Sequence, residues 1–574
     1  MPAPRSRVAS AADGPCTERP PTTLPAGAPH APAGGHGGRS GLPPTRRTLP
    51  GMTGPQRTRN RTALLVTPQL AASLGAGVTG SGRTACHSPL TGDRLAELPA
   101  TAVSEVADAF ATARAAAPAW AARPVRERAA VLLRFHDLLL RRQDEVLDLL
   151  QLDTGKARTH AHDEVLGAAL AARYYGRRGP GLLRERSRAG VVPVLTRVRE
   201  YHRPHGVVGQ IVPWNYPLEL TVEDALPALL AGNAVVTKPD TEGALAALWT
   251  RRLMVEAGLP ADVWRMVIGE GPVVGPAVVA EADYVAFTGS TATGRRVAAQ
   301  AAERLVGSTL ELGGKNAMLV LDDADPARAA AGAVRACFSS AGQLCISTER
   351  ILVHESVADA FTERFVALTR AMRLGAPLAW GTDMGSLSSQ TQLDRTTGHI
   401  DGAVALGARV LTGGRHRPDL GPYFHEPTVL TDVTPGMALY HEETFGPVVS
   451  VRRVRDDEEA ITLANDTAYG LNASVWSRDR CRARQIAARL RTGSVGINDG
   501  FAAAYGSVSA TMGGMGESGL GRRHGAAGLL KYTESQTVAH QRLVPLAPSL
   551  GMDDRQFAAL ASLSLKALKA LRLP

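Results

Sequence analysis

The chain has 574 residues, 44% hydrophobic and 21% charged, a composition typical of a soluble globular protein with roughly two to four domains. Its formal charge of +10 lies mostly in residues 1–61, where nine arginines face two acidic residues, so the remainder lacks the basic excess of a nucleic-acid-binding protein. No apolar stretch is long enough to span a membrane, and five cysteines, an odd number, do not form a disulfide framework, which favours a reducing cytoplasm.

Residues 1–61 are rich in Pro, Ala, Gly, Thr and Arg and contain almost no large apolar side chains. Such a segment cannot bury enough surface to offset its ordering entropy, so we predict a disordered basic tail. Two alternatives stay open: translation begins at Met52, or Arg46-Arg47 and the apolar stretch 62–78 form an export signal. Arginines and Pro68 interrupt that stretch, which argues against export.

From residue 102 onward, the hydrophobic pattern alternates between helical and β periods. Helical patterns cover 103–120, 125–152 and 244–257, and short β-branched or apolar runs lie at 207–212, 225–230, 234–237, 263–268 and 284–287. After Glu311 the alternation resumes, with strands at 317–321 and 350–353 and helices at 326–337 and 357–372. This order predicts an α/β fold with two mainly parallel sheets in series.

Three segments fall outside this alternation of strands and helices. Residues 191–201 and 537–543 are isolated β-rich runs, which form either arms that pair across subunits or a simple edge hairpin. Residues 553–573 have the Leu/Ala/Lys pattern of an amphipathic helix, and we expect it to dock on the protein surface rather than on a membrane.

Cys345 is the cysteine whose surroundings suggest chemistry. It follows a run of small residues, 339–344, that lets the backbone approach a substrate closely. A free cysteine is more often buried core, as we expect for Cys337, while Cys86 is expected in a loop and Cys481 on a helix. The case for Cys345 as a nucleophile therefore depends on its companions.

Three other segments are individually ambiguous. Glu311 lies between a strand-like run and two glycines, as a turn carboxylate or a catalytic base. Asn215, between two prolines, is a turn residue or a donor to a developing oxyanion. The glycines of 269–275 resemble a dinucleotide-binding turn with one residue too many.

Taken together, these segments resemble the aldehyde dehydrogenase superfamily over residues 65–545. Seven motifs occur in the family's order: Pro-Trp-Asn-Tyr-Pro at 213–217, Lys-Pro-Asp at 238–240, Phe-Thr-Gly-Ser-Thr-Ala-Thr-Gly at 287–294, Glu-Leu-Gly-Gly-Lys at 311–315, Gly-Gln-Leu-Cys at 342–345, Glu-Thr-Phe-Gly-Pro at 443–447, and 465–471. The spacing of 34 residues between Glu311 and Cys345 is also that of the family. Within it, the chain looks most like the actinobacterial NADP-dependent succinate-semialdehyde dehydrogenases.

The resemblance implies a fold and a mechanism. The fold would be a Rossmann-type cofactor domain, an α/β catalytic domain and a β oligomerisation arm. Cys345 would attack an aldehyde to give a thiohemiacetal and then a thioester, and Glu311 would activate the water that releases the acid. The Asn215 amide and the Cys345 N–H would hold the oxyanion.

The cofactor implied is NADP or NAD, and no metal site is expected. Glu443 and Phe445 match the residues that hold the nicotinamide ribose and flank its ring, Lys238 the adenosine-ribose contact, and Ser290 a pyrophosphate contact at a helix N-terminus. Thr241 stands where NAD-dependent relatives carry glutamate, which favours NADP or dual use. The other cofactor-binding candidates carried over from the motifs are Trp214, Asp240, Gly271, Gly289, Thr291 and Leu312.

The chain departs from the family where a substrate carboxylate would bind. The usual arginines are replaced by Asp224 and Ser339, and Thr511 stands where proline is usual. The substrate is therefore succinate semialdehyde held by another cation, or a different aldehyde without a carboxylate. A coenzyme A-acylating relative and a catalytically silent scaffold are disfavoured, because Glu311 and Cys345 are both retained.

The resemblance also implies domain boundaries and a homodimer or homotetramer, with no nucleic-acid or membrane partner. We predict an NAD(P)-binding domain at 62–312 with an arm strand at 186–204, a catalytic domain at 313–525, a second arm strand within 526–545 and a C-terminal amphipathic helix within 546–574.

Overall fold

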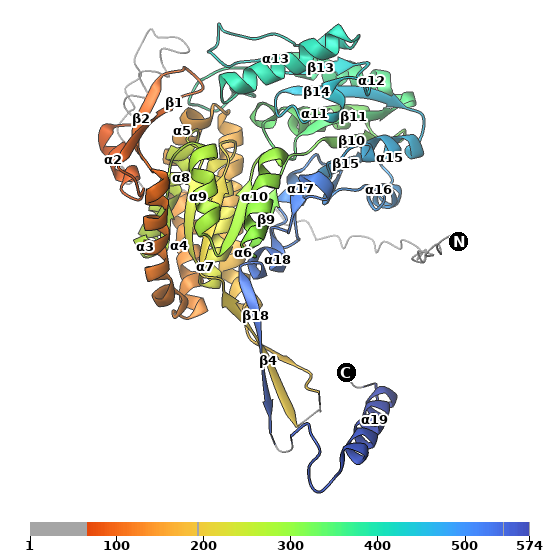
Figure 1. The fold of residues 1–574 in the computed structure, drawn as a ribbon. Coiled ribbons are helices and arrows are strands. Elements are labelled where there is room, and N and C mark those ends of the chain that lie inside the picture. Colours follow the sequence, from red (N-terminus) through yellow and green to blue (C-terminus); the bar gives the residue numbers. More distant parts are fainter. Residues whose placement is uncertain (1–65, 192–194, 543–544, 573–574) are drawn as a thin grey trace, which may run out of the picture.

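The computed structural model describes residues 66–191, 195–542 and 545–572. They form two sheets covered by helices and a three-stranded arm that projects from the rest of the molecule (Figure 1). This architecture confirms the α/β class. The predicted basic tail, residues 1–61, lies outside the described residues. Within the described ranges, no helix is both long and apolar enough to cross a membrane.

The first sheet has the strand order β17-β9-β8-β5-β6-β7. Its five main strands are parallel: β5 (Val207–Val212), β6 (Ala234–Pro239), β7 (Trp264–Met266), β8 (Tyr284–Thr288) and β9 (Gly307–Glu311). The chain runs outward from β5 to β7 and then returns to build β8 and β9 on the other side. The carboxyl ends of β5 and β8 therefore flank a topological switch point, the place where parallel sheets bind ligands.

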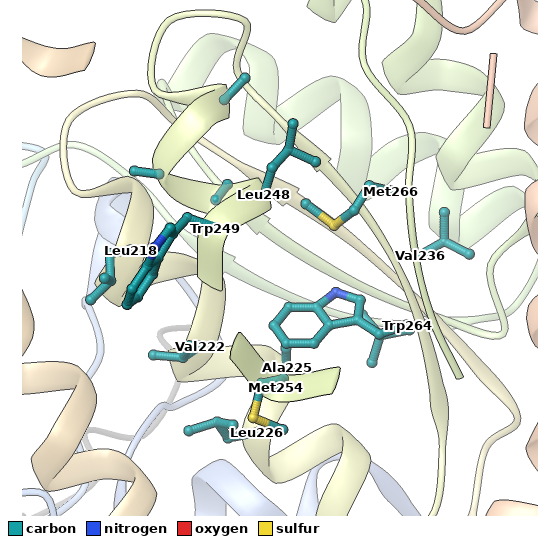
Figure 2. Close-up of a cluster of buried hydrophobic side chains, with 14 of the residues drawn as sticks. Leu218, Val222, Ala225, Leu226, Val236, Leu248, Trp249, Met254, Trp264 and Met266 are labelled. Atoms are coloured by element: carbon teal, nitrogen blue, oxygen red, sulfur yellow. The ribbon is translucent and has the colours of Figure 1, made fainter. Parts of the chain in front are cut away.

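Helices α7 (Pro217–Ala231) and α8 (Ala244–Glu256) pack on this sheet through a continuous apolar core (Figure 2). Trp249 and Trp264 are among its largest fully buried side chains. The Trp264 indole still donates a hydrogen bond of 2.8 Å to Thr237 Oγ1, so its burial leaves no polar atom unpaired. Every residue of α7 is buried, and the turn that precedes it is held in place with the helix.

Several further elements surround the first sheet. They are α2 (Pro68–Gly75), α3 (Val103–Ala121), α4 (Val125–Arg141), α5 (Gln143–Thr154), α6 (Arg158–Leu182), α9 (Gly271–Glu281), α10 (Thr291–Glu303) and the hairpin of β1 (Gly82–His87) and β2 (Arg94–Ala100).

The second sheet has the order β12-β13-β14-β11-β10-β15-β16 and is parallel except for the β12–β13 pair. Its strands are β10 (Asn316–Val320), β11 (Thr348–His354), β12 (Arg409–Thr412), β13 (Thr428–Thr431), β14 (Val448–Val454), β15 (Asn472–Trp476) and β16 (Ser494–Ile497). The helices that follow β9 are α11 (Pro326–Phe338), α12 (Glu355–Arg370), α13 (Gln390–Ala405), α14 (Ala438–His441), α15 (Asp457–Asn465), α16 (Arg480–Ala487), α17 (Ala502–Tyr505) and α18 (Gly525–Leu530).

One short strand returns from this second unit to the first sheet. β17 (Gly519–Leu520) pairs antiparallel with β9, and Gly519 lies opposite Glu311. The carboxyl end of β9 is therefore enclosed by residues that come about 200 positions later in the chain.

The two isolated β-rich runs pair with each other. β4 (Thr196–Pro204) and β18 (Thr533–Gln541) are antiparallel, and β3 (Arg186–Arg188) lies on the other side of β4. They form the projecting arm of Figure 1. Whether the arm joins subunits stays a prediction.

The C-terminal helix α19 (Asp554–Ala570) has the predicted bounds within a few residues. None of its residues is buried, and it lies apart from the two sheets, beyond the arm (Figure 1). The expected docking on the surface of its own chain is thus not found among the described residues.

Three local predictions were wrong. Residues 225–230, predicted as a strand, are the second half of α7, because a helix buried on all sides loses the polar positions that reveal its period. The helical run 125–152 is two helices, α4 and α5, separated at Arg142. Cys86, expected in a loop, lies in β1.

Candidate functional site

The loops that carry Asn215, Glu311 and Cys345 meet between the two sheets. Asn215 follows β5 and donates a hydrogen bond of 3.0 Å from Nδ2 to the carbonyl of Gln343, two residues before Cys345. Glu311 ends β9, and its charge acts on the pKa of the Cys345 thiol. The three residues proposed for catalysis thus lie together, although 130 positions separate the first from the last.

The backbone before Cys345 is strained in a way the sequence pattern did not indicate. Ser340 and Ala341 adopt left-handed φ angles of 49° and 56°, and Gly342 follows at 71°. A Cβ on Gly342 would lie 2.1 Å from the carbonyl oxygen of Gly446, so glycine is required there. Three consecutive left-handed residues persist only where the surrounding packing holds them, and such strain is common at functional sites.

The Cys345 thiol is half-buried and protonated at neutral pH. Burial, followed by the negative charges of Glu311 and Glu443, raises the pKa of the thiol to about 12, and Arg523 opposes this shift. The Cys345 carbonyl accepts a hydrogen bond of 2.8 Å from Asn316 Nδ2, which fixes the backbone on the side away from the thiol's chemistry. Thiolate formation therefore needs a base or an added positive charge.

Glu311 has the properties of a general base. Its side chain is buried, and neither carboxylate oxygen forms a hydrogen bond with any part of the chain that the structure describes. Burial raises its pKa to about 7, against the opposing charges of Arg523 and Lys531. A carboxyl group that titrates near neutrality can both accept and return a proton at physiological pH.

Glu443 and Phe445 lie on a loop whose backbone is hydrogen-bonded to a buried ion pair. Glu349 forms an ion pair of 2.5 Å with Lys315 and accepts hydrogen bonds from the N–H groups of Thr444 and Phe445. Phe445 takes a φ angle of 57° and contacts the Trp214 ring edge to face, with 5.6 Å between ring centroids. Together the two rings make a rigid apolar wall beside the site.

The Glu443 carboxylate faces the glycine pair that follows Glu311. Glu443 Oε1 accepts a hydrogen bond of 2.8 Å from the Gly314 N–H, and a Cβ on Gly313 would lie 2.5 Å from Oε2. Burial and the charge of Glu349 raise the pKa of Glu443 to about 7. The Glu443 carboxylate can therefore lie against the backbone after β9 only because residue 313 has no side chain.

The residues proposed for cofactor binding surround the switch point. Lys238, at the end of β6, is 2% exposed, and its ammonium group forms no hydrogen bond with the described residues. Burial lowers its pKa, so the ammonium needs an acceptor to stay charged there. A Cβ on Gly271, the first residue of α9, would lie 4.0 Å from Lys238 Nζ.

That N-terminus of α9 also lacks a side-chain cap among the described residues. Pro272 has no N–H, and Val273 and Val274 donate theirs to the Glu270 carbonyl, so the Gly271 N–H is the donor this turn leaves beside the Lys238 ammonium. The two groups fit a ligand that carries hydroxyl and phosphate oxygens. Asp240 and Thr241 follow β6 directly, half-buried, and Glu242 donates its backbone N–H to Asp240 Oδ1 at 3.2 Å.

Four more candidates lie around β8 and β9. Ser290 caps α10, as predicted, and accepts the Thr293 N–H at 3.3 Å. Gly289 donates its N–H to the Glu311 carbonyl at 3.1 Å. Thr291 and Leu312 bond instead to the segment before β17, Thr291 Oγ1 to the carbonyl of Glu517 at 3.1 Å and Leu312 N to that of Ser518 at 3.0 Å.

The sequence did not reveal a buried network behind Glu311. Asp224, which occupies a position of a family arginine, accepts hydrogen bonds from Arg523 Nε at 3.1 Å, Lys531 Nζ at 2.9 Å and the Tyr532 hydroxyl at 2.6 Å. Although burial opposes its ionisation, Arg523 and Lys531 hold the pKa of Asp224 below its usual value. Asp224 therefore neutralises two cations rather than meeting a substrate carboxylate.

A second apolar wall packs against Cys345. Phe501 and Met512 are buried against the Leu344–Ile346 segment, and Tyr505 packs at the margin of the same cluster. Arg335, on α11, lies at the outer side of this wall, with its guanidinium carbon 5.9 Å from the Phe501 ring centroid. Ser339, the other position of a family arginine, is one helical turn further and donates its hydroxyl to the Arg335 carbonyl at 2.8 Å.

Several known proteins are similar to this chain in sequence and in fold. Residues 78–538 match the family described as "Aldehyde dehydrogenase family". A protein of Mycolicibacterium smegmatis named "Putative succinate-semialdehyde dehydrogenase (NADP(+))" is 52% identical over 80% of this chain and 89% of its own length. A betaine aldehyde dehydrogenase of Cereibacter sphaeroides is 40% identical over 78% of this chain and 92% of its own. The crystal structure of PnpE in complex with nicotinamide adenine dinucleotide superimposes with a TM-score of 0.78, 36% identity and coverage of 82% of this chain and 96% of its own.

The high thiol pKa gives the first prediction. In the cofactor-free protein, alkylation of Cys345 by iodoacetamide should keep accelerating as the pH rises from about 7 to about 10, because little thiolate exists below a pKa near 12. Glu311→Gln removes a neighbouring negative charge, lowers the thiol pKa and should make alkylation at pH 8 several-fold faster. Mass spectrometry of the Cys345 peptide measures both rates, with buried Cys337 as the internal control. A rate plateau below about pH 9 in the wild type would contradict the expected pKa.

Proposed function

Since the chain belongs to the aldehyde dehydrogenase family, we propose that it oxidises succinate semialdehyde to succinate with NADP as the preferred cofactor. The observation that carries the reaction is the unpartnered Glu311 carboxyl, with a pKa of about 7, beside the Cys345 thiol. The relatives named for this aldehyde support the choice of substrate.

The proposed chemistry begins at Cys345. Its thiol loses a proton to solvent, and its sulfur attacks the aldehyde carbon. The Asn215 amide and the Cys345 N–H donate hydrogen bonds to the oxyanion of the thiohemiacetal. The nicotinamide ring, when bound, supplies the hydride acceptor, so that the bond to Cys345 becomes a thioester. Glu311 then takes a proton from water, which attacks the thioester and releases the acid.

The residues around the switch point would hold NADP. Lys238 would donate to the adenosine ribose, Ser290 and the N-termini of α9 and α10 to the phosphates, and Glu443 would accept from the nicotinamide ribose. The rings of Trp214 and Phe445 would flank the nicotinamide. Gly271 and Gly289 would let the backbone approach the cofactor closely, and Thr291 and Leu312 would contact it.

The loop after β6 supports NADP over NAD. Thr241 carries no charge and can donate its hydroxyl to a 2′-phosphate, whereas a carboxylate there would repel it. Burial and the charge of Asp240 raise the pKa of Glu242 to about 7, which reduces the negative charge of this loop at neutral pH.

Arg335 is the cation that we propose for the distal carboxylate of succinate semialdehyde. Its side chain is 58% exposed, and its only ion pair among the described residues, with Asp163 at 3.6 Å, is long and solvent-accessible. An exposed pair of this kind contributes little, so the guanidinium can exchange partners at small cost. Its contact with Phe501 puts it at the rim of the apolar wall around Cys345.

A second candidate substrate is an aldehyde without a carboxylate, such as betaine aldehyde. Glu219 and Glu223, one turn apart on α7, are buried, and Tyr505 donates its hydroxyl to Glu223 at 2.9 Å. Glu219 Oε1 has no hydrogen-bond partner within the described ranges. These acidic groups near the apolar wall favour a positively charged or donor-bearing substrate over an anionic one.

We further propose a homodimer or homotetramer, assembled through the β3-β4-β18 arm, that acts in the cytoplasm without nucleic-acid or membrane partners. The exposed outer strand β18 supports subunit contact. Cys86, Cys337 and Cys345, which are free thiols, support a reducing compartment.

The substrate is tested with an aldehyde panel. Wild-type protein should have a higher kcat/KM for succinate semialdehyde than for butanal or betaine aldehyde, measured from NADPH absorbance. Arg335→Met should raise KM for succinate semialdehyde about tenfold, because it removes the proposed carboxylate partner, and should leave the values for butanal unchanged. Arg328→Met, also exposed on α11, is the matched control and should change neither. A wild-type preference for betaine aldehyde would support the second candidate instead.

Glu311 is tested by its titration. Since the carboxylate must be ionised to accept a proton, the deacylation rate should rise as the pH increases through about 7 and level off above it. Glu311→Gln cannot accept the proton, so stopped-flow absorbance should record one burst of NADPH followed by very slow turnover. Steady-state turnover at the wild-type rate without a burst would exclude Glu311 as the base.

Cofactor choice is tested at Thr241. Thr241→Glu should shift the preference toward NAD, because the new carboxylate accepts a bond from the ribose hydroxyl and repels a 2′-phosphate. A charge pair at about 4 Å is worth roughly 4 kcal/mol at an effective dielectric of about 20, and we expect about 1–2 kcal/mol after screening by solvent and Lys238. The NADP-to-NAD ratio of kcat/KM should therefore fall roughly tenfold. An unchanged ratio would mean that the ribose binds elsewhere.

A further inference from the structure

The buried ammonium group of Lys156 is hydrogen-bonded to the backbone of the turn that carries Asn215. It lies between α5 and α6 and is 2% exposed. Its Nζ donates a hydrogen bond of 2.6 Å to the Asn215 carbonyl, forms an ion pair with Glu164 and lies 3.8 Å from the Tyr216 ring centroid. One ammonium thus contacts two successive residues of the turn and a carboxylate on a neighbouring helix.

Glu164 connects this ammonium to the helix that follows the turn. Its side chain on α6 is fully buried, and Oε2 accepts the N–H groups of Leu218 at 2.9 Å and Glu219 at 3.3 Å. These are the second and third residues of α7, whose own N-cap residue, Tyr216, supplies no side-chain cap. Glu164 therefore caps α7 from another helix. The positive end of the α7 dipole in turn stabilises the negative charge of the Glu164 carboxylate.

The two interactions hold the turn at both of its ends. The Lys156 bond fixes the Asn215 carbonyl, and the Glu164 bonds fix the first turn of α7. Between them, the Asn215 side chain points toward the Cys345 loop, where its Nδ2 donates to the Gln343 carbonyl. A mispositioning of 1 Å at an oxyanion donor is enough to reduce a rate about a hundredfold.

We propose that Lys156 and Glu164 are positioning residues that aim the Asn215 amide at the oxyanion formed on Cys345. This inference rests on the proposed function, since it takes Asn215 as the oxyanion donor. Neither residue touches the reacting atoms, and both act through the backbone on either side of Asn215.

Simple stabilisation is the competing explanation, and it fits the pair less well. Removing both ions from water carries a large cost, and apolar residues of similar volume often stabilise a protein as well as a buried ion pair does. Burial lowers the pKa of Lys156 and raises that of Glu164, in keeping with this cost. An ion pair in this place is explained better by the directional bonds it makes to the turn.

The test is a double-mutant cycle on the first turnover. Wild type, Lys156→Met, Asn215→Ala and the double variant are mixed with NADP and succinate semialdehyde, and the rate constant of the NADPH burst is measured by stopped flow. Lys156→Met should slow the burst at least about tenfold in the wild type, yet less than about twofold in the Asn215→Ala background, because the group it positions is then missing. NADP affinity should stay within about twofold in all four proteins.

Equal slowing by Lys156→Met in both backgrounds, or no slowing in the wild type, would overturn the inference and assign the pair to stability alone. Asn215→Ala by itself should slow the burst about a hundredfold. If it does not, the oxyanion role of Asn215 in the proposed function fails as well, an outcome distinct from failure at Lys156.

Two further variants guard against misfolding. Lys156→Met/Glu164→Gln buries no charge and keeps an oxygen for the N–H groups of α7, so it should fold and still show the slow burst; a wild-type burst would overturn the inference. Arg158→Met is the matched control, because Arg158 is an equally buried cation on α6 whose guanidinium bonds Asp148 and Gln151. It should lower the Tm but leave the burst rate within about twofold.

Discussion

The low-dielectric surroundings of Cys345 set the protonation state of the whole site. Burial raises the pKa of Cys345, Glu311 and Glu443 together, so three groups that could carry negative charge at neutral pH are wholly or partly protonated. Arg523 is the cation whose charge opposes this at both Cys345 and Glu311. Three acidic groups can thus lie close together without strong repulsion, because each is wholly or partly neutral at neutral pH.

That arrangement depends on loops supplied by both sheets. Asn215 comes from the carboxyl end of β5 in the first sheet, whereas Cys345 comes from the strained segment before β11 in the second. Glu311 lies at the junction, as the last residue of β9 before β10 begins the second sheet. The site consequently lies at the boundary between two packing units. Its geometry depends on the buried ion pairs and the close glycine contacts that join these units.

Much of this was predictable from the chain, for identifiable reasons. The alternation of helical and β periods after residue 102 predicted the parallel sheets, since strand and helix periods differ sharply. The ordered motifs singled out Cys345, Glu311 and Asn215, and the structure brings these three together. The cofactor-binding residues taken from the same motifs stay a prediction. Periodicity failed where burial is complete, as in the second half of α7, and it carried no information about the left-handed angles of Ser340 and Ala341.

The buried ion networks escaped sequence analysis because each joins residues far apart in the chain, such as Asp224 with Arg523 and Lys531. A compositional signal for them did exist. The chain has 58 arginines and only six lysines, and Lys156, Lys238, Lys315 and Lys531 all have side chains that are nearly or wholly enclosed. The other two lysines, Lys566 and Lys569, lie on α19, which has no buried residue. An ammonium is a compact point charge, so the four enclosed lysines differ in shape from the planar guanidinium that the chain uses elsewhere.

The pairing of β17 with β9 also has a consequence for the order in which the protein matures. Glu311 and its strand are synthesised long before Gly519, which closes the edge of the sheet opposite it, and the Ser518 carbonyl that bonds Leu312 arrives just as late. A nascent chain can fold its first sheet while the ribosome is still translating the second unit, since amino-terminal domains generally fold first. Until about residue 523 emerges, however, Glu311 remains at an open strand edge without the charge of Arg523. In a truncated chain that keeps both Cys345 and Glu311, neither pKa would therefore be set as in the complete protein, because Arg523 acts on both groups. The two residues acquire their final electrostatic surroundings only when synthesis is nearly finished.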